Sequence, residues 1–367
     1  MGCSLAYHLA QRGVDVLLLE RAGLASGSTS KNAGGVRQQF STEINVRIQM
    51  LAVRMLLDFE QEVGAPSDFR QNGYLFLLTR PQEVVDFQAL VEMWHRVGLT
   101  EARWLSASDA QAMVPCLKVD DVLGCTYCPS DGIASPDSVT MGYAAAARRL
   151  GARIREGVGV TGIDVSGGRV SGVRTSLGEV STRVVFDCAG PWAAEVGRLA
   201  GVAVPVEPHR RHIYVTDAFP AVPREAPFTI DFATSFYLHP EGDGILMGMS
   251  DRQAPATFST ELDEAFTDRV IEAAVARVPA LENAGIRTAW AGLYEVTPDH
   301  QAILGPAEDV DGFWCACGFS GHGFMQAPPA GRLLAQLLVE GRSEIDLQPL
   351  SPARFSKGGF RAERNVI

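Results

Sequence analysis

The sequence lacks the features of a membrane protein and of a nucleic-acid-binding protein. No apolar run approaches the roughly 18–20 residues that a helix needs to cross a bilayer. No stretch is dense in Lys and Arg, and with 32 basic against 43 acidic residues the net charge is −11. This charge argues against nucleic acid or an anionic membrane as the main partner. Because no basic segment followed by an apolar stretch marks a targeting signal, we expect a cytoplasmic protein.

Cysteine is too scarce to supply a disulfide framework, since seven cysteines are spread over 367 residues. Cys125 and Cys128 have the spacing of a zinc or redox pair, and Cys315 and Cys317 form a second candidate pair. Incidental core thiols are the favoured interpretation, because cysteine is among the residues most often buried. The sequence also shows no Ser-His-Asp or zinc-binding constellation, so we predict no metal site.

The N-terminus has the pattern of the second half of a dinucleotide-binding βαβ unit. Gly2 opens an apolar helical stretch, Gly13 interrupts it, and residues 14–19 are typical of a buried strand that ends at Glu20. In the complete unit a strand and two further glycines precede the helix, the helix N-terminus faces a pyrophosphate, and an acid about 20 positions on holds a ribose hydroxyl. We therefore expect Gly2 and Glu20 to be the last glycine and the acid, with the first strand missing.

Further along the chain, two segments have the pattern of a buried strand that runs through small residues into a helix. They cover residues 184–192 and 313–324, and backbone N–H groups at such junctions can meet a phosphate or a ring. Residues 153–188 read as strand, hairpin and strand, and residues 205–250 as short strands of a separate antiparallel substrate domain. Residues 22–40 form a long irregular connection, which inside a compact domain is usually functional.

Several motifs together resemble a known family. Gly2-Cys-Ser-Leu-Ala-Tyr-His-Leu-Ala, Asp187-Cys-Ala-Gly-Pro-Trp192, Gly292-Leu-Tyr-Glu-Val-Thr-Pro-Asp-His300 and Gly318-Phe-Ser-Gly-His-Gly-Phe324 occur in the order found in FAD-dependent amine oxidoreductases of the D-amino-acid oxidase superfamily. The chain is most similar to the subgroup of sarcosine oxidase and its β subunit, glycine oxidase and the β-type subunit of proline dehydrogenase. The resemblance covers nearly the whole chain apart from its front.

The resemblance implies an α/β (mixed α+β) protein in which a Rossmann-like FAD-binding domain is interleaved with an antiparallel-sheet substrate domain. We expect the discontinuous FAD-binding domain to comprise residues 1–43, 125–208 and 289–350. The substrate domain would comprise residues 44–124 and 209–288, followed by a C-terminal tail, 351–367.

The resemblance also assigns the cofactor residues. Gly2 and Glu20 would serve the AMP half of FAD, and Val160 its adenine end. Ala189, Gly190 and Trp192 would lie along the ribityl chain. The remaining predicted cofactor residues, around the pyrophosphate and the flavin ring, are Arg21, Ser26, Ser28, Asn32, Ala33, Gly34, Gly35, Gly292, Gly318, Gly321, His322, Gly323 and Phe324.

Departures from the family pattern carry information about the cofactor and the electron acceptor. In sarcosine oxidase a cysteine that bonds covalently to the flavin stands at the position of Gly292, so we expect non-covalent FAD. Two lysines of that enzyme, one implicated in oxygen reactivity and one in substrate binding, correspond to Leu246 and Met325. We therefore expect a dehydrogenase that passes electrons to a quinone, another flavin or a partner protein, more than an oxidase.

Amine oxidation by a flavin requires a positioned substrate, and for a carboxylate-bearing substrate a cation and orienting hydroxyls. Arg37 is the first candidate for the cation, with a loop salt bridge as its alternative interpretation. Tyr237 and Tyr294 are candidate orienting phenols, with plain core packing as theirs. Arg210 and Arg211 fit the start of the substrate domain or a solvated strand end, and we expect His300 to face a turn.

These features predict an FAD-dependent oxidoreductase that oxidises the C–N bond of sarcosine, proline, dimethylglycine, glycine or a D-amino acid. An alternative is a flavoprotein subunit or assembly factor with little turnover. A third is an inactive truncated form, because loss of a central parallel strand costs several kcal/mol, on the order of the largest single-site effects.

Overall fold

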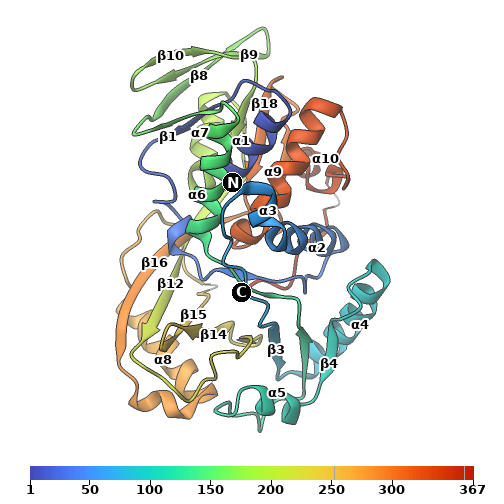
Figure 1. Cartoon of the computed structure of the whole chain (residues 1–367), viewed down its shortest axis with the longest axis vertical. Helices are drawn as coiled ribbons and strands as arrows, with labels where there is room; N and C mark the ends of the chain where they lie inside the picture. The colour runs from blue at the N-terminus through green and yellow to red at the C-terminus, as the bar shows by residue number, and fades with distance from the viewer. Residues whose placement is uncertain (252, 359) are drawn as a thin grey trace.

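The structure is a computed structural model that describes residues 1–251, 253–358 and 360–367. The chain crosses several times between two parts (Figure 1). Helices and small sheets around the N-terminus form the upper part in Figure 1, and an eight-stranded sheet with its helices forms the lower part. This arrangement confirms the predicted mixed α/β class with an interleaved, mainly antiparallel sheet, whereas the domain boundaries stay a prediction.

Helix α1 (Gly2–Gln11) lies between α6 (Pro136–Arg149) and α9 (Gly323–Glu340). Its buried residues serve both neighbours, because residues on its two sides join two different apolar clusters. The contact with α9 is close: a Cβ on Gly331 would lie 2.3 Å from Ser4 Oγ. That hydroxyl donates to the carbonyl of Pro328 at 3.1 Å. A small residue at position 331 therefore fixes how deeply α1 sits.

The parallel strands of the nucleotide-binding part form two separate groups. Strand β1 (Leu17–Glu20) pairs with β7 (Arg153–Glu156), and β11 (Val185–Asp187) pairs with β18 (Phe313–Cys317), whose other edge carries antiparallel β17 (Ile303–Pro306). Within the described residues no strand pairing joins the two groups. Val16, Leu18 and Phe186 line the space between them. The strand that the N-terminal motif predicts beside β1 stays a prediction.

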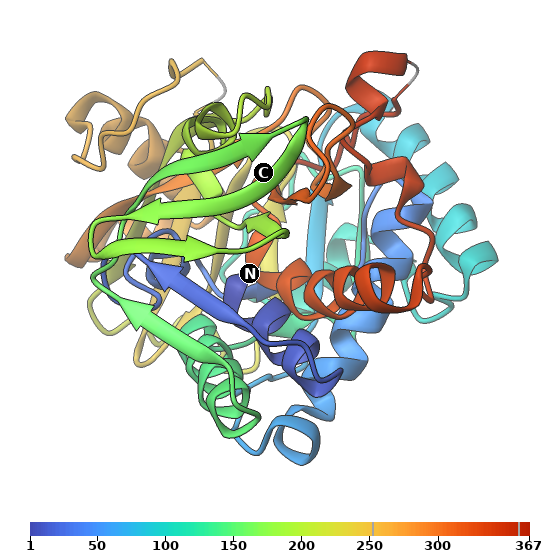
Figure 2. The same cartoon turned by 90° about the horizontal axis from the view of Figure 1, so that it is seen from above.

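A three-stranded antiparallel meander covers the top of this part (Figures 1 and 2). It consists of β8 (Val160–Ser166), β9 (Arg169–Thr175) and β10 (Gly178–Ser181). The hairpin expected within residues 153–188 is confirmed, and its turn lies at Gly167 and Gly168, since both residues have positive φ and Ser166 lies opposite Arg169. Helix α7 (Ala193–Leu199) packs beneath β8.

The large sheet has the strand order β16-β12-β15-β14-β13-β3-β5-β4. The bounds are β3 (Tyr74–Leu78), β4 (Arg103–Leu105), β5 (Gly124–Cys128), β12 (Glu207–Thr216), β13 (Phe228–Asp231), β14 (Phe236–Glu241), β15 (Gly244–Met249) and β16 (Ile286–Val296). Its two faces bury different clusters, because side chains alternate along a strand. Tyr214 packs on the face covered by α8 (Glu264–Arg277) and α5 (Ala107–Met113), whereas Ile213 and Val215 face the nucleotide-binding part.

The remaining elements complete the two parts. They are α2 (Glu43–Leu57), α3 (Phe59–Val63), α4 (Pro81–Val97), α10 (Arg354–Lys357), the small pair β2 (Gly35–Val36) and β6 (Gly132–Ile133), and the short 3-10 helices η1 (Thr29–Lys31), η2 (Gly190–Trp192), η3 (Pro279–Asn283) and η4 (Gln348–Leu350). After α10 the chain returns to the centre of the molecule (Figure 1). The seven cysteines are free thiols. Among the helices described, none is long and apolar enough to cross a membrane.

Candidate cofactor and substrate site

A continuous cavity of about 1400 Å³ lies between the two parts of the molecule. It extends from the N-terminus of α1 and the end of β1 to the inner face of the large sheet at Tyr74 and Tyr237. Ligand pockets usually occupy roughly 300–1,000 Å³. The cavity is larger because it includes both a chamber over the sheet and the space between β1 and β11.

Two helix N-termini open into this cavity. In the described part of the chain, neither α1 nor α9 has a side-chain hydrogen bond at its N-cap, and neither has an acidic residue in its first turn. Gly2 and Cys3 of α1 and Gly323 and Phe324 of α9 line the cavity. The backbone N–H groups of these first turns and the positive ends of the helix dipoles therefore face it. A diphosphate group requires such a set of donors. The carbonyl oxygen of a ring that gains negative charge requires it as well.

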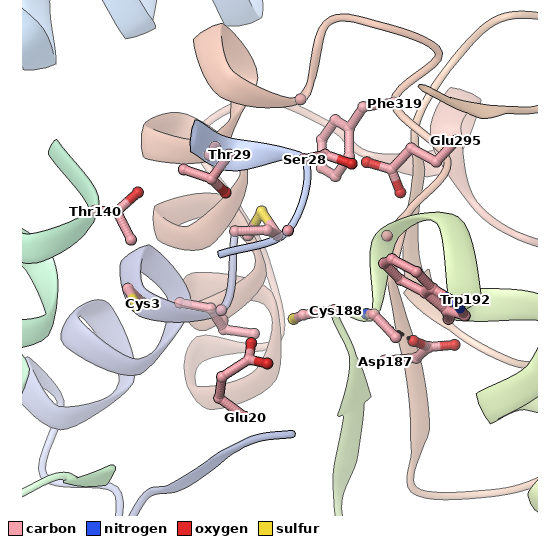
Figure 3. A pocket seen from close by; sticks show the side chains of 18 of the residues that line it. Cys3, Glu20, Ser28, Thr29, Thr140, Asp187, Cys188, Trp192, Glu295 and Phe319 are labelled. Carbon is pink, nitrogen blue, oxygen red and sulfur yellow. Dashed lines mark hydrogen bonds between the residues drawn. The ribbon is translucent and has the colours of Figure 1, made fainter. Parts of the chain in front are cut away.

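One wall of the cavity carries two carboxyl groups, the buried Asp187 and the half-buried Glu295, beside Trp192 (Figure 3). Asp187 Oδ1 accepts a hydrogen bond from the N–H of Ala189 at 3.0 Å, whereas Oδ2 is buried and has no partner among the residues that the structure describes. Burial raises the pKa of Asp187 to about 7. It also raises the pKa of Glu295 to about 7, although N–H donors such as that of Gly318, at 2.8 Å, oppose the shift. An acceptor left unpaired at this depth fits a ligand with hydroxyl groups, such as the ribityl chain.

The loop before β2 is held against β16, which fixes the opposite wall. Ser28 Oγ donates to the carbonyl of Leu293 at 2.7 Å, and Asn32 closes a turn by accepting from the N–H of Gly34 at 2.7 Å. A Cβ on Gly292 would lie 3.0 Å from the Cβ of Lys31. The position that carries the flavin-bonded cysteine in sarcosine oxidase is therefore tightly packed here and offers no thiol.

Aromatic side chains form the end of the cavity at the large sheet. The rings of Tyr74 and Phe228 stack with centroids 4.3 Å apart, and Tyr237 stacks on Phe228 at 5.3 Å. Burial raises the pKa of Tyr74 and Tyr237 well above the usual range and raises that of Tyr294, so all three phenols stay protonated. The guanidinium of Arg211 lies 4.9 Å from the centroid of the Tyr294 ring. This end therefore combines hydroxyl donors, a cation and apolar surface.

Arg37, the predicted substrate cation, lines the cavity but is only 2% exposed. Its Nη1 donates to the carbonyl of Gln39 at 2.9 Å, and its Nη2 donates to the carbonyl of Asn365. Nη2 also lies 3.1 Å from His322 Nε2. Because a guanidinium has no acceptor, this contact requires a neutral His322 with its proton on Nδ1. Burial and the charge of Arg37 both lower the pKa of His322, which also favours its neutral form.

The structure brings most of the predicted site residues together around this cavity. Among the predicted cofactor residues, only Gly34 and Gly318 do not line it. Gly34 has a positive φ and a Cβ there would lie 2.6 Å from the carbonyl of Ala134, so it shapes the loop from behind. Gly318, also at positive φ, donates its N–H to Glu295. All other predicted cofactor residues, together with Arg37, Tyr237 and Tyr294, line the cavity.

Sequence reasoning missed Tyr74, Arg211 and Phe228 as site residues. The sequence marked Arg211 only as part of a strand start, and no local signal shows that Tyr74 and Phe228 become neighbours through parallel pairing of β3 with β13. Arg210 is not a solvated strand end, because it donates to the carbonyl of Glu261 at 2.9 Å. His300 lies in the turn between β16 and β17, as expected.

Comparison with known proteins places this geometry in a family. Residues 1–337 match the family model described as DAO, FAD dependent oxidoreductase. The chain is 34% identical over 97% of its length to mouse mitochondrial sarcosine dehydrogenase and 33% identical over 97% to human mitochondrial dimethylglycine dehydrogenase. It spans 40% and 43% of the lengths of these two relatives.

A solved structure has the same fold over almost the whole chain. L-proline dehydrogenase from P. horikoshii is 31% identical and superposes with a TM-score of 0.92, covering 98% of this chain and 96% of that one. The matching family model spans nearly all of the elements that build the cavity. The chain therefore belongs to the DAO family of FAD-dependent oxidoreductases.

Proposed function

We propose that this chain is an FAD-dependent dehydrogenase of a small carboxylate-bearing amine, such as sarcosine, dimethylglycine, proline, glycine or a D-amino acid. One observation carries the proposal: a single cavity joins a diphosphate-type donor set at α1 and α9 to an end that holds Arg211 and the phenols of Tyr237 and Tyr294. The names of the relatives, sarcosine, dimethylglycine and L-proline dehydrogenase, agree with this class of substrate.

The chain's residues fit FAD without a covalent bond. The first turn of α1 would hold the diphosphate and Glu20 the adenosine ribose, while Asp187 Oδ2 would accept from a ribityl hydroxyl. The first turn of α9 would face the pyrimidine side of the ring. When bound, FAD supplies the acceptor for the hydride that leaves a carbon bonded to the substrate's amine nitrogen. Gly292 leaves no thiol at the position of the sarcosine oxidase linkage, so we expect acid to release the flavin.

The residues at the sheet end would bind and orient the substrate. Arg211 is the cation for the carboxylate, and Tyr237 and Tyr294, which stay protonated, donate hydrogen bonds that fix its direction. Arg37 adds positive charge from behind this end. Burial beside two guanidinium groups disfavours a further cation, so the substrate amine binds more readily in its neutral form. The stacked rings of Tyr74 and Phe228 exclude water from the reacting carbon.

The electron acceptor would be a quinone, another flavin or a partner protein. The two positions that carry lysine in sarcosine oxidase hold Leu246 and Met325, both buried. A cation near the ring favours oxygen reduction by stabilising the developing superoxide charge, and neither position supplies one.

Anaerobic addition of each candidate amine to the flavin-loaded protein tests the proposed function. We expect at least one to bleach the flavin absorbance, and acid precipitation of the same sample to leave the flavin in the supernatant. A flavin-loaded protein that none of them bleaches would contradict the enzyme assignment and favour the non-catalytic subunit. Flavin that stays with the precipitate would contradict non-covalent binding alone.

A further inference from the structure

Three side chains form a stack at one border of the cavity. The guanidinium of Arg21 lies 3.9 Å from the centroid of the Trp192 ring. The ring of Phe258 stacks on the same indole with centroids 5.7 Å apart and an interplanar angle of 16°. Stacked rings and a guanidinium over an indole face are favourable contacts. We call these three residues the rim stack.

The rim stack lies where the cavity meets solvent. All three residues line the cavity. Arg21 is exposed, Phe258 is 44% exposed and Trp192 is half-buried. Lining residues at the sheet end, such as Tyr74 and Tyr237, are in contrast buried. A ligand at this border of the cavity therefore has the rim stack between it and bulk water.

The rim stack connects the two parts of the molecule. Arg21 follows β1 and Trp192 ends η2, both in the nucleotide-binding part, whereas Phe258 comes from the connection between β15 and α8 of the large sheet. The chain around Phe258 is anchored on both sides. The N–H of Thr257 donates to the carbonyl of Pro208 at 2.8 Å, and Arg210 pairs with Asp263 at 3.0 Å.

We propose that Phe258 is a cofactor-retaining residue that, with Trp192 and Arg21, closes the cavity over the diphosphate of FAD, between the adenosine ribose and the ribityl chain. The inference rests on the proposed placement of FAD, with its ribose at Glu20, the residue just before Arg21. Opening the rim requires separation of Phe258 from Trp192 in addition to the loss of direct contacts with the ligand. Arg21 also places a positive charge beside a dianionic diphosphate.

The rate of FAD release tests this role. Flavin-loaded protein is diluted, and the recovery of flavin fluorescence reports free FAD. We expect Phe258→Ala to release FAD about tenfold faster than wild type, because the loss of one aromatic stacking contact raises a dissociation rate by about this factor. Phe258→Trp should restore slow release. The matched control is Leu262→Ala, because Leu262 is 45% exposed on the same connection and does not line the cavity.

Each outcome decides the inference. The inference is supported if Phe258→Ala releases FAD faster than wild type, while Leu262→Ala and Phe258→Trp do not. Equal release from wild type and Phe258→Ala overturns it, and so does equal acceleration by Leu262→Ala, which would show general loosening of the connection. A wild-type chain that takes up no FAD would overturn the proposed function as well, so the two failures are distinguishable.

Discussion

Replacement of Arg211 by Met should weaken the binding of carboxylate-bearing ligands by about ten- to a hundredfold. A charge-assisted hydrogen bond contributes roughly 1.5–3 kcal/mol. Arg211 lies at the half-buried start of the aromatic end, 4.9 Å from the Tyr294 ring, where solvent screening is only partial. Met keeps most of the side-chain length without the charge, so the loss should appear in ligand affinity while FAD content stays at the wild-type level.

The assay is a titration of the flavin-loaded protein with a non-reactive carboxylate such as acetate, followed by the change in flavin absorbance. The matched control is Arg287→Met, because Arg287 is exposed on the same strand as Tyr294 and pairs with Asp243 at 2.8 Å. Arg37→Met provides the contrast. It removes a buried guanidinium that donates hydrogen bonds to two carbonyl groups, so the midpoint of thermal unfolding and the FAD content should both fall. Unchanged acetate affinity in Arg211→Met would refute the reasoning and return the anchor role to Arg37.

Three further predictions concern the acceptor, the pH dependence and the C-terminal segment. Turnover with an artificial acceptor should greatly exceed turnover with oxygen, and Leu246→Lys should raise the oxygen rate; rapid peroxide formation by wild type would contradict this. Because burial raises the pKa of Asp187 to about 7 in the folded state, folding takes up a proton between pH 4 and 7 and this carboxyl's contribution falls as pH rises. The decline in unfolding free energy from pH 5 to pH 8, followed by thermal melts, should therefore be about 1–3 kcal/mol smaller in Asp187→Asn than in wild type. An unchanged decline would contradict the raised pKa of Asp187. Asp299→Asn should cost about 3–5 kcal/mol in unfolding free energy measured with urea, since Asp299 and Arg354 form a buried pair at 2.7 Å; a loss below ~1 kcal/mol would show that the pair is dispensable.

The cofactor end of the site was accessible to sequence reasoning because its geometry is local. A helix that starts at a glycine, a strand that ends in an acid, and a glycine-rich turn before a helix each impose a backbone shape within about 20 residues. Gly2, Glu20 and Gly321 accordingly line the same cavity in the structure. At Gly321 the requirement is physical, because its φ is +94° and a Cβ would lie 2.3 Å from the ring of Tyr294.

The substrate end was not accessible because it depends on pairing between distant strands. Tyr74 faces the cavity only because β3 pairs in parallel with β13, which sets Tyr74 opposite Phe228. Arg211 reaches the cavity because β12 places it opposite Gly292 of β16. A shift of one residue in either register would turn these side chains to the other face of the sheet. Local periodicity does not determine such a register.

Arg37 lies at the cavity, but its predicted role as the substrate cation stays a prediction. The loop motif places this residue at the cavity, but residues 360–367, more than 320 positions later in the chain, determine what its guanidinium contacts. The carbonyl of Asn365 accepts from Arg37, and Glu363 holds that segment in place by accepting from the N–H groups of Ser41 at 2.7 Å and Asn365 at 3.0 Å. Arg37 in turn holds His322 neutral at the start of α9. The guanidinium that the sequence predicts for the substrate thus organises the start of α9, which favours Arg211 as the proposed substrate anchor.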